Sequence, residues 1–324
     1  MDRRRRRTGA LAGLALAAAG FLAAATAAEV AQPLQALHWV TPDADPVATF
    51  ASQPTECLHT PADPAAAQAV EVGRAAFRTP LLLGGQAARV SLTCESCHRS
   101  GRGNPEFQFP GASGAPGTAD VTLSLFSSHR GNGVHDPRPI PDLSGPRDRL
   151  KVAPDQLPAF IRGLIVEEFD GREPPPAVLA GLAAYVRALS PGACPAEARA
   201  PLRPATLLAD ARRALTAADR AYAAGDRPTA ILMVAAARAR LGLIDERYKA
   251  LPAEVARLRA ADTRLTALQQ AMREGRADAS TDLARWLRHS RRLEAALAAR
   301  EAASLFNPTR LKAAANRRLL PKPT

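Results

Sequence analysis

Aromatic residues and long apolar runs are scarce in this chain of 324 residues. Phe, Trp and Tyr make up 4% of the sequence, which is too few for one large aromatic core, although 47% of the residues are hydrophobic. Only one apolar run, residues 11–25, is long, which excludes a polytopic membrane protein. The hydrophobic content excludes a disordered chain, and the length suits one or two packed domains.

Charge and proline are distributed unevenly along the chain. The formal net charge of +12 divides into +4 for residues 1–28, −4 for 29–195 and +12 for 196–324. Of the 28 prolines, 23 lie between residues 32 and 205. The sequence therefore predicts a loop-rich, slightly acidic middle that is followed by a basic, proline-poor helical region.

The N-terminus has the order of a secretory signal. Arg3 to Arg7 are cationic, residues 11–25 are apolar, and Ala25-Thr26-Ala27 is a small-residue cleavage site. We predict a signal peptide over residues 1–28, export to the periplasm, and an N-terminal extension over 29–55. The alternative is an uncleaved segment that anchors the protein to the membrane.

The stretch Cys94-Glu95-Ser96-Cys97-His98 is the most informative in the chain. C-x-x-C-H is the attachment signature of c-type haem, in which the two thiols bond to the porphyrin and the histidine binds iron as proximal ligand. A zinc site would need a second ligand pair, and a thioredoxin-like redox pair would need a βαβ context. The sequence predicts one covalent haem c, held by Cys94, Cys97 and His98.

Two cysteines remain outside the motif. Cys57 precedes the predicted haem region and Cys194 follows it. In an oxidising compartment they can form a disulfide that clamps the two ends of one domain. The alternative is a pair of buried, unpaired thiols.

Two apolar helices flank the motif and carry a resemblance. Gly73-x-x-x-Phe77 before the motif and Leu182-Ala183-Ala184-Tyr185-Val186 after it resemble the N- and C-terminal helices of a class I cytochrome c domain. The stretch 73–101 is also similar to the di-haem cytochrome c peroxidase family. The resemblance covers residues 56–195 and implies an all-α haem domain. A single C-x-x-C-H departs from the peroxidase pattern, so the two-haem relay of that family is not possible within one molecule.

The sixth iron ligand stays open at this stage. Class I cytochromes use a methionine, and residues 56–195 contain none. The loop after the motif offers His129 first and His135 second, and the alternative is an open or water-bound iron. Two histidine ligands favour electron transfer, whereas an open position favours a peroxidase-like enzyme. We also expect the porphyrin to be lined by the segment 140–143 and by three aromatic residues, Phe107, Phe109 and Phe126.

The C-terminal region has the apolar periodicity of helices. The spacing predicts helices over 205–223, 228–250, 252–274, 279–301 and 309–319, after a linker at 196–204. Short connections favour an antiparallel helical bundle over 205–319. A di-iron bundle is excluded, because the region has one histidine, His289, and no Glu three residues before it.

The fold class predicted overall is all-α, with a cytochrome c-like haem domain before the bundle. The basic bundle is expected to dock an acidic redox protein or to lie on an anionic membrane surface, and a solvated charged face is the alternative. Nucleic acid is not an expected partner for an exported protein. The leading hypothesis is an exported mono-haem c-type cytochrome that transfers electrons, and the alternative is a peroxidase-like haem enzyme with an open sixth iron position.

Overall fold

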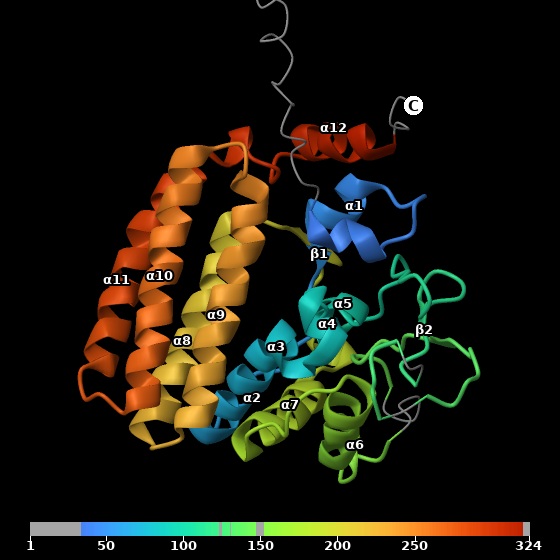
Figure 1. Ribbon diagram of the computed structural model, residues 1–324, viewed down its shortest axis with the longest axis horizontal. Coiled ribbons are helices and arrows are strands. Elements are labelled where there is room, and N and C mark those ends of the chain that lie inside the picture. Colours follow the sequence, from blue (N-terminus) through green and yellow to red (C-terminus); the bar gives the residue numbers. More distant parts are fainter. Residues whose placement is uncertain (1–33, 123–124, 130, 147–151, 320–324) are drawn as a thin grey trace, which may run out of the picture. The chain divides into compact units, whose positions relative to one another are not determined.

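Most of the chain that can be described is helical, in agreement with the predicted fold class (Figure 1). The computed structural model describes residues 34–122, 125–129, 131–146 and 152–319. The predicted signal peptide, residues 1–28, lies outside these described residues. Two short antiparallel strand pairs accompany the helices.

The C-terminal region consists of long helices whose ends lie within three residues of the predicted ranges. Proline occupies the first turn of each, where a missing backbone N–H costs nothing, except in the fourth helix. Gly275, with φ of 73°, ends the third helix in the left-handed conformation that glycine adopts without strain. The helices are α8 (Pro204–Ala223), α9 (Arg227–Tyr248), α10 (Pro252–Glu274), α11 (Ala279–Ala298) and α12 (Pro308–Leu319).

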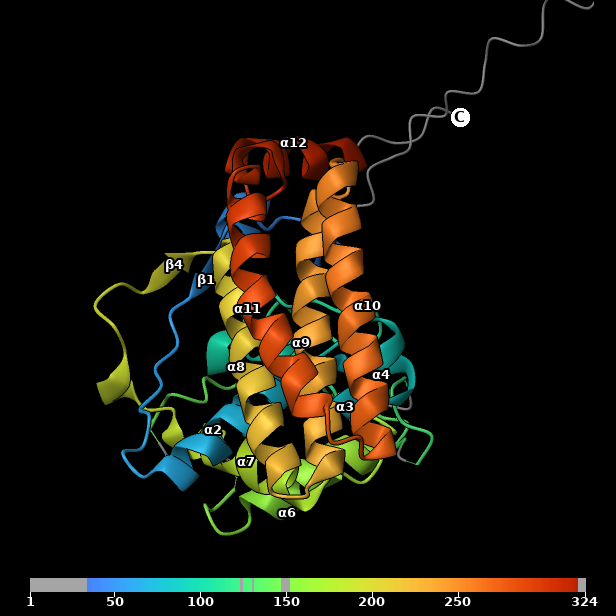
Figure 2. The ribbon, with the colours of Figure 1, turned by 90° about the vertical axis from the view of Figure 1, so that its left-hand side faces the viewer.

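Four of these helices lie side by side in both views (Figures 1 and 2). Helix α8 packs against α9 and α11, and α10 packs against α9 and α11. Their facing sides are rich in alanine and leucine, which lets the helices approach closely. Helix α12 packs instead against α1 (Pro46–Phe50) near the beginning of the described chain.

The first half of the chain folds into shorter elements joined by loops. Its two main helices are α2 (Pro64–Phe77) and α7 (Pro176–Ala188). The other helical segments of this half are η1 (Gln35–Trp39), α3 (Pro80–Leu83), α4 (Gly85–Arg89), α5 (Cys94–Cys97), η2 (Arg99–Gly101), α6 (Leu157–Gly163), the π-helical turn η4 (Leu164–Glu168) and η5 (Pro191–Ala193). In the C-terminal region, the short segment η6 (Glu301–Ala303) follows α11. The strands are β1 (Ser52–Pro54), β2 (Thr118–Ala119), β3 (Arg138–Pro139) and β4 (Arg199–Pro201).

Helices α2 and α7 cross in close contact. The crossing point is Gly73 on α2 and Gly181 on α7, where a Cβ atom on either residue would overlap the backbone of the other helix. The rings of Phe77 and Tyr185 pack at a tilt next to the crossing, with centroids 5.1 Å apart. The glycine pair therefore sets the distance between the two helices that flank the C-x-x-C-H motif in sequence.

We predict that Gly73→Ala lowers the free energy of unfolding by about 1–3 kcal/mol, because the new methyl group forces the two helices apart. Chemical denaturation followed by circular dichroism measures the change. The matched control is Gly242→Ala on α9, where an added Cβ atom has nothing within 4 Å. The free energy of unfolding of this control is expected to rise by about 0.5–1 kcal/mol, because alanine has a higher helix propensity than glycine. Equal unfolding free energies for Gly73→Ala and the unmodified protein would contradict the prediction.

One continuous core joins the two halves of the chain. Helix α2 packs against both α8 and α9. Phe77 and Tyr185 of the first half belong to the same cluster of buried hydrophobic residues as Leu208 and Met233 of the C-terminal helices. The residues predicted as a linker include β4, which pairs antiparallel with β1 (Figure 2). The C-terminal helices thus stand directly against the region that contains the motif.

Candidate functional site

The C-x-x-C-H motif lies on a single capped helical turn, α5. The Thr93 hydroxyl accepts a hydrogen bond from the Ser96 N–H at 3.2 Å, and the Ser96 hydroxyl accepts one from the Thr93 N–H at 3.1 Å. This reciprocal pair of bonds, a capping box, stabilises a helix of only four residues. A three-residue offset on a helix places Cys94 and Cys97 on the same face. Both thiols are free and half-buried.

His98 ends this turn and is held in a defined orientation. Its backbone N–H donates to the Cys94 carbonyl at 2.9 Å. Its ring Nδ1 lies 3.0 Å from the Pro141 carbonyl oxygen, which can only accept, so Nδ1 carries the proton. Nε2 is therefore unprotonated and free to bind a metal, in the arrangement that is common for histidine ligands.

The three motif side chains are partly buried. Burial raises the pKa of Cys94 and Cys97 to about 12, and it lowers the pKa of His98 to about 4. Each of the three nevertheless keeps part of its surface exposed. Redox-active C-x-x-C pairs have a lowered thiol pKa, which is the opposite of what is found here.

The residues after the motif hold the α5 turn in place through a hydrogen bond and close packing. Asn104 donates a hydrogen bond from its side-chain amide to the Ser96 carbonyl at 2.8 Å. Gly101 has a φ of 72°, and a Cβ atom at this position would collide with Leu189 and approach the hydroxyl of Tyr185. The motif is thus packed directly onto the end of α7.

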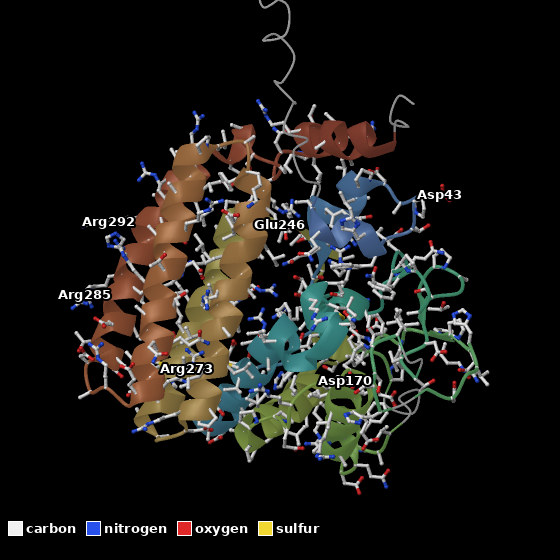
Figure 3. All side chains as sticks on the ribbon, in the orientation of Figure 1. Asp43, Asp170, Glu246, Arg273, Arg285 and Arg292 are labelled. Carbon is white, nitrogen blue, oxygen red and sulfur yellow. A yellow bond between two sulfur atoms is a disulfide. The ribbon has the colours of Figure 1, made fainter. Side chains whose placement is uncertain are left out.

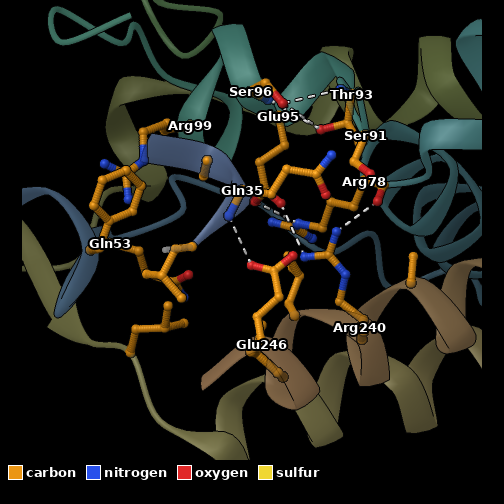
Figure 4. A pocket seen from close by; sticks show the side chains of 18 of the residues that line it. Gln35, Gln53, Arg78, Ser91, Thr93, Glu95, Ser96, Arg99, Arg240 and Glu246 are labelled. Carbon is orange, nitrogen blue, oxygen red and sulfur yellow. Dashed lines mark hydrogen bonds and ion pairs between the residues drawn. The ribbon is translucent and has the colours of Figure 1, made fainter. Parts of the chain in front are cut away.

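Glu95, a spacer residue within the motif, connects the turn to the C-terminal helices. Its carboxylate accepts from Arg78 Nε at 2.8 Å and from Arg240 Nη1 on α9 at 3.2 Å (Figure 4). Arg240 Nη2 also donates to the Arg78 carbonyl at 2.6 Å. Burial acts to raise the pKa of Glu95, but the charges of Arg78 and Arg240 outweigh it and hold the pKa at about 2.

Arg78 extends this buried ion-pair network to a second carboxylate, Glu56. Arg78 Nη2 lies 2.9 Å from Glu56, which also pairs with Arg74 of α2 and accepts from the Tyr185 hydroxyl at 2.6 Å. Burial acts to raise the pKa of Glu56, but the charges of Arg78 and Arg74 hold it at about 2. Six side chains from five parts of the fold therefore meet behind the motif. Sequence reasoning missed them, because no spacing in the sequence indicates that they converge.

Cys57 and Cys194 form the predicted disulfide. Cys57 follows Glu56 of the network and is fully buried. The bond lies near the β1–β4 pair and ties the beginning of the motif-bearing region to the segment that leads into α8. Neither sulfur is available as a metal ligand, which weakens the zinc alternative.

The two histidines considered as sixth ligands lie on an exposed loop. His129 has 65% of its side chain exposed, and its Nε2 lies 3.9 Å from Asp170 Oδ1. Asp170 also accepts from the Ser128 backbone N–H at 2.8 Å, which orients this part of the loop. His135 is exposed as well. Any role of either residue at the iron stays a prediction.

The three aromatic residues expected at the porphyrin take part in the protein core. Phe107 and Phe126 are buried, and Phe107 forms a β-bridge with Val40. The Phe109 ring stands between Trp39, at a centroid distance of 6.3 Å, and Phe126, at 5.1 Å. The Pro141 carbonyl of the predicted lining segment, in contrast, directly contacts His98. The segment 140–143 thus has a structural link to the motif.

The arrangement fits covalent haem better than it fits other groups. Two free thiols share one face of a short helix, the adjacent histidine has an unprotonated Nε2, and all three side chains keep part of their surface exposed. Within the described part of the chain, no three or more His, Cys, Asp or Glu residues converge as a metal-binding group. None of the described helices has the length and apolar character of a transmembrane span.

Comparison with known proteins adds no relative. No family model matches the chain, and neither a curated protein nor a solved structure matches it significantly.

Proposed function

We propose that this protein is an exported mono-haem c-type cytochrome that transfers electrons in the periplasm. The observation that carries the proposal is the geometry of Cys94, Cys97 and His98: two free thiols on one face of a capped turn, beside a histidine that is oriented by the Pro141 carbonyl. The other two cysteines are joined in a disulfide, so Cys94 and Cys97 are the pair with free thiols.

The residues of the motif have separate tasks in this proposal. Cys94 and Cys97 would hold the porphyrin edge through their Sγ atoms, and His98 would bind the iron through Nε2. The bound haem supplies a one-electron redox centre. The Pro141 carbonyl keeps Nδ1 protonated and fixes the ring plane, which strengthens His98 as a ligand. The capping box keeps the two thiols at a constant spacing.

The proposal includes a cytochrome c-like domain over residues 56–195 and an antiparallel helical bundle over 205–319. The crossing of α2 and α7 at Gly73 and Gly181 supports the first, because the resemblance identified these two helices as the terminal pair of such a domain. The packing of α8 to α11 on one another supports the second.

The basic C-terminal helices are the proposed docking surface for an acidic redox protein. Residues 196–324 contain 25 basic and 13 acidic residues. Arg273, Arg285 and Arg292 project outward from α10 and α11, on the side away from the motif (Figure 3). An anionic membrane surface would be attracted by the same charges.

Haem staining tests the central claim. The protein is expressed together with a c-type haem maturation system, and the periplasmic fraction is separated on a denaturing gel. We expect a haem-positive band at the size of the protein, and complete loss of this band in Cys94→Ser/Cys97→Ser. The control pair Cys57→Ser/Cys194→Ser should keep the stain per amount of protein recovered. An unstained band from the unmodified chain would end the proposal.

A peroxidase-like enzyme is the second candidate, and one observation favours it. His129 and His135 are both exposed on their loop, which is compatible with an iron that keeps its sixth position open. A high-spin ferric spectrum that responds to added peroxide would favour the enzyme. A low-spin spectrum that is lost in His129→Ala would favour the carrier with His129 as the sixth ligand.

A further inference from the structure

A cavity of about 400 Å³ lies behind the C-x-x-C-H turn (Figure 4). It is bounded by η1, by α9 and by the face of α5 that contains Glu95 and Ser96. Cys94, Cys97 and His98 are not among its lining residues, so the cavity lies on the opposite side of the turn from the proposed haem site. Its volume is within the range of small-molecule pockets.

Two arginines in the cavity wall bond to backbone carbonyl oxygens rather than to carboxylates. Arg99 Nη2 donates to the Thr49 carbonyl at 2.6 Å, and Arg247 Nη2 donates to the Phe50 carbonyl at 2.9 Å. Among the described residues, neither arginine forms an ion pair with a carboxylate within 4.0 Å. Carbonyl acceptors satisfy some of the N–H groups, but they leave both positive charges in place.

The remaining charged groups of the wall do not cancel this surplus. Arg240 is paired with Glu95, as described above. Glu246 lines the cavity and accepts from the Gln35 backbone N–H at 3.2 Å, and burial raises its pKa. The pKa of Arg247 is lowered to about 10, chiefly by burial; the charge of Glu246 opposes this shift and the charge of Arg99 adds to it. The charge of Glu246 acts on Arg247, and the charges of Glu95 and Glu106 act on Arg99. None of these carboxylates forms a direct ion pair with either guanidinium in the described part of the chain, so an anionic ligand can bind there.

The rest of the wall is apolar. Leucine and aromatic side chains from four separate parts of the fold line the space, among them Leu34, Trp39, Phe50, Leu207 and Leu243. A fully hydrated inorganic ion would leave these surfaces in contact with water. A ligand with an acidic head and an apolar body would satisfy both parts of the wall.

Gly242 marks the open side of the cavity. It lies within α9 and lines the cavity, and an added Cβ atom there would have nothing within 4 Å. A glycine inside a helix costs about 0.5–1 kcal/mol relative to alanine. The other glycines between residues 196 and 319 lie in turns with a positive φ, which is 82° for Gly225 and 73° for Gly275. Gly242 is exposed, and it leaves room beside the apolar wall in which the body of a ligand can lie.

We propose that this cavity binds a small organic carboxylate with an apolar body, held at its head by Arg99 and Arg247. A carboxylate matches the planar donor groups of arginine, and its two oxygens can accept from both side chains. The apolar body lies against the leucine and aromatic wall beside Gly242. The site is separate from the proposed haem site and does not depend on it.

Isothermal titration of the exported protein with octanoate tests this inference. We expect octanoate to bind and octan-1-ol to bind at least tenfold more weakly, because the alcohol lacks the charge. Gly242→Leu fills the cavity without removing a polar group and improves helix propensity. It should weaken octanoate binding at least tenfold. Gly163→Leu on α6 is the matched control, since its added Cβ atom also has nothing within 4 Å but the residue is outside the cavity.

Arg247→Met tests the head group, with an expected 10- to 100-fold loss of affinity for octanoate. Three results would overturn the inference: no octanoate binding by the unmodified protein, equal binding by Gly242→Leu, or equal binding of octanoate and octan-1-ol. Haem staining should be the same in Gly242→Leu as in the unmodified chain. Failure of this inference would therefore leave the haem proposal unaffected.

Discussion

Arg78→Met is expected to lower the free energy of unfolding by about 3–5 kcal/mol, because it leaves two buried carboxylates without their shared cation. Arg78 is 6% exposed and bonds to both Glu56 and Glu95. Methionine keeps much of the side-chain volume, so most of the loss reflects charge and hydrogen bonding. Urea denaturation at pH 7, followed by circular dichroism, measures the difference.

The control for this variant is Arg138→Met. Arg138 pairs with Asp136 at 2.8 Å, but 67% of its side chain is exposed. An exposed pair contributes little, so the control should change stability by less than about 0.5 kcal/mol. If Arg78→Met were no more destabilising than Arg138→Met, the buried network would not contribute to stability as described.

The pH dependence of stability provides a second readout for the same variant. The pKa of Glu56 is about 2 in the folded protein and 4.5 as its ordinary value. Its ionised form therefore stabilises the fold above pH 4.5, and this contribution is lost as the pH falls from about 4.5 toward 2. Removing the Arg78 charge raises the folded pKa of Glu56. The stability of Arg78→Met should thus depend less steeply on pH in this window than that of the unmodified protein.

Loss of the Cys57–Cys194 disulfide is expected to destabilise the protein by about 4 kcal/mol, since it closes a loop with a sequence separation of 137 residues. The unfolded chain gains conformational freedom when this loop is opened. Cys57 is also fully buried next to Glu56, so the Ser hydroxyl of Cys57→Ser needs a new hydrogen-bond partner. Denaturant unfolding of Cys57→Ser/Cys194→Ser measures the effect.

The single variant Cys194→Ser separates the two contributions. Cys194 lies at the surface, so its replacement opens the loop without placing a hydroxyl in the core. It should account for most of the 4 kcal/mol loss, and reduction of the unmodified protein with dithiothreitol should give a similar value. Unfolding free energies of the reduced and oxidised protein within about 1 kcal/mol of each other would show that the loop constraint is unimportant.

Local patterns predicted the long helices well. Proline and glycine mark the ends of α8, α9 and α10, and the apolar spacing between these ends is regular. The short elements of the first half were not predicted, because they depend on distant contacts. Strand β1, for example, exists through its pairing with β4, almost 150 residues later in the chain.

Of the candidate site, the sequence predicted only the residues that would bond to haem and the disulfide pair. Cys94, Cys97 and His98 form a recognisable spacing, and Cys57 and Cys194 were the remaining pair once that motif was set aside. Glu95 was read as a spacer, although its carboxylate joins the motif to α9. Phe107 lies in the core, where it forms a β-bridge with Val40, and its contact with the porphyrin stays a prediction. Neither position could be assigned without knowing which segments pack together.

The sequence by itself determined the helical character of the chain, the uneven charge and the proposed haem chemistry, because periodicity and motif spacing are local properties. Only the tertiary structure decided that Pro141 orients His98, that Arg78 joins Glu56 to Glu95, and that Arg99 and Arg247 share a cavity. These contacts join residues that are 17 to more than 140 positions apart. Folding brings them together through burial of a common core, which no short stretch of sequence describes.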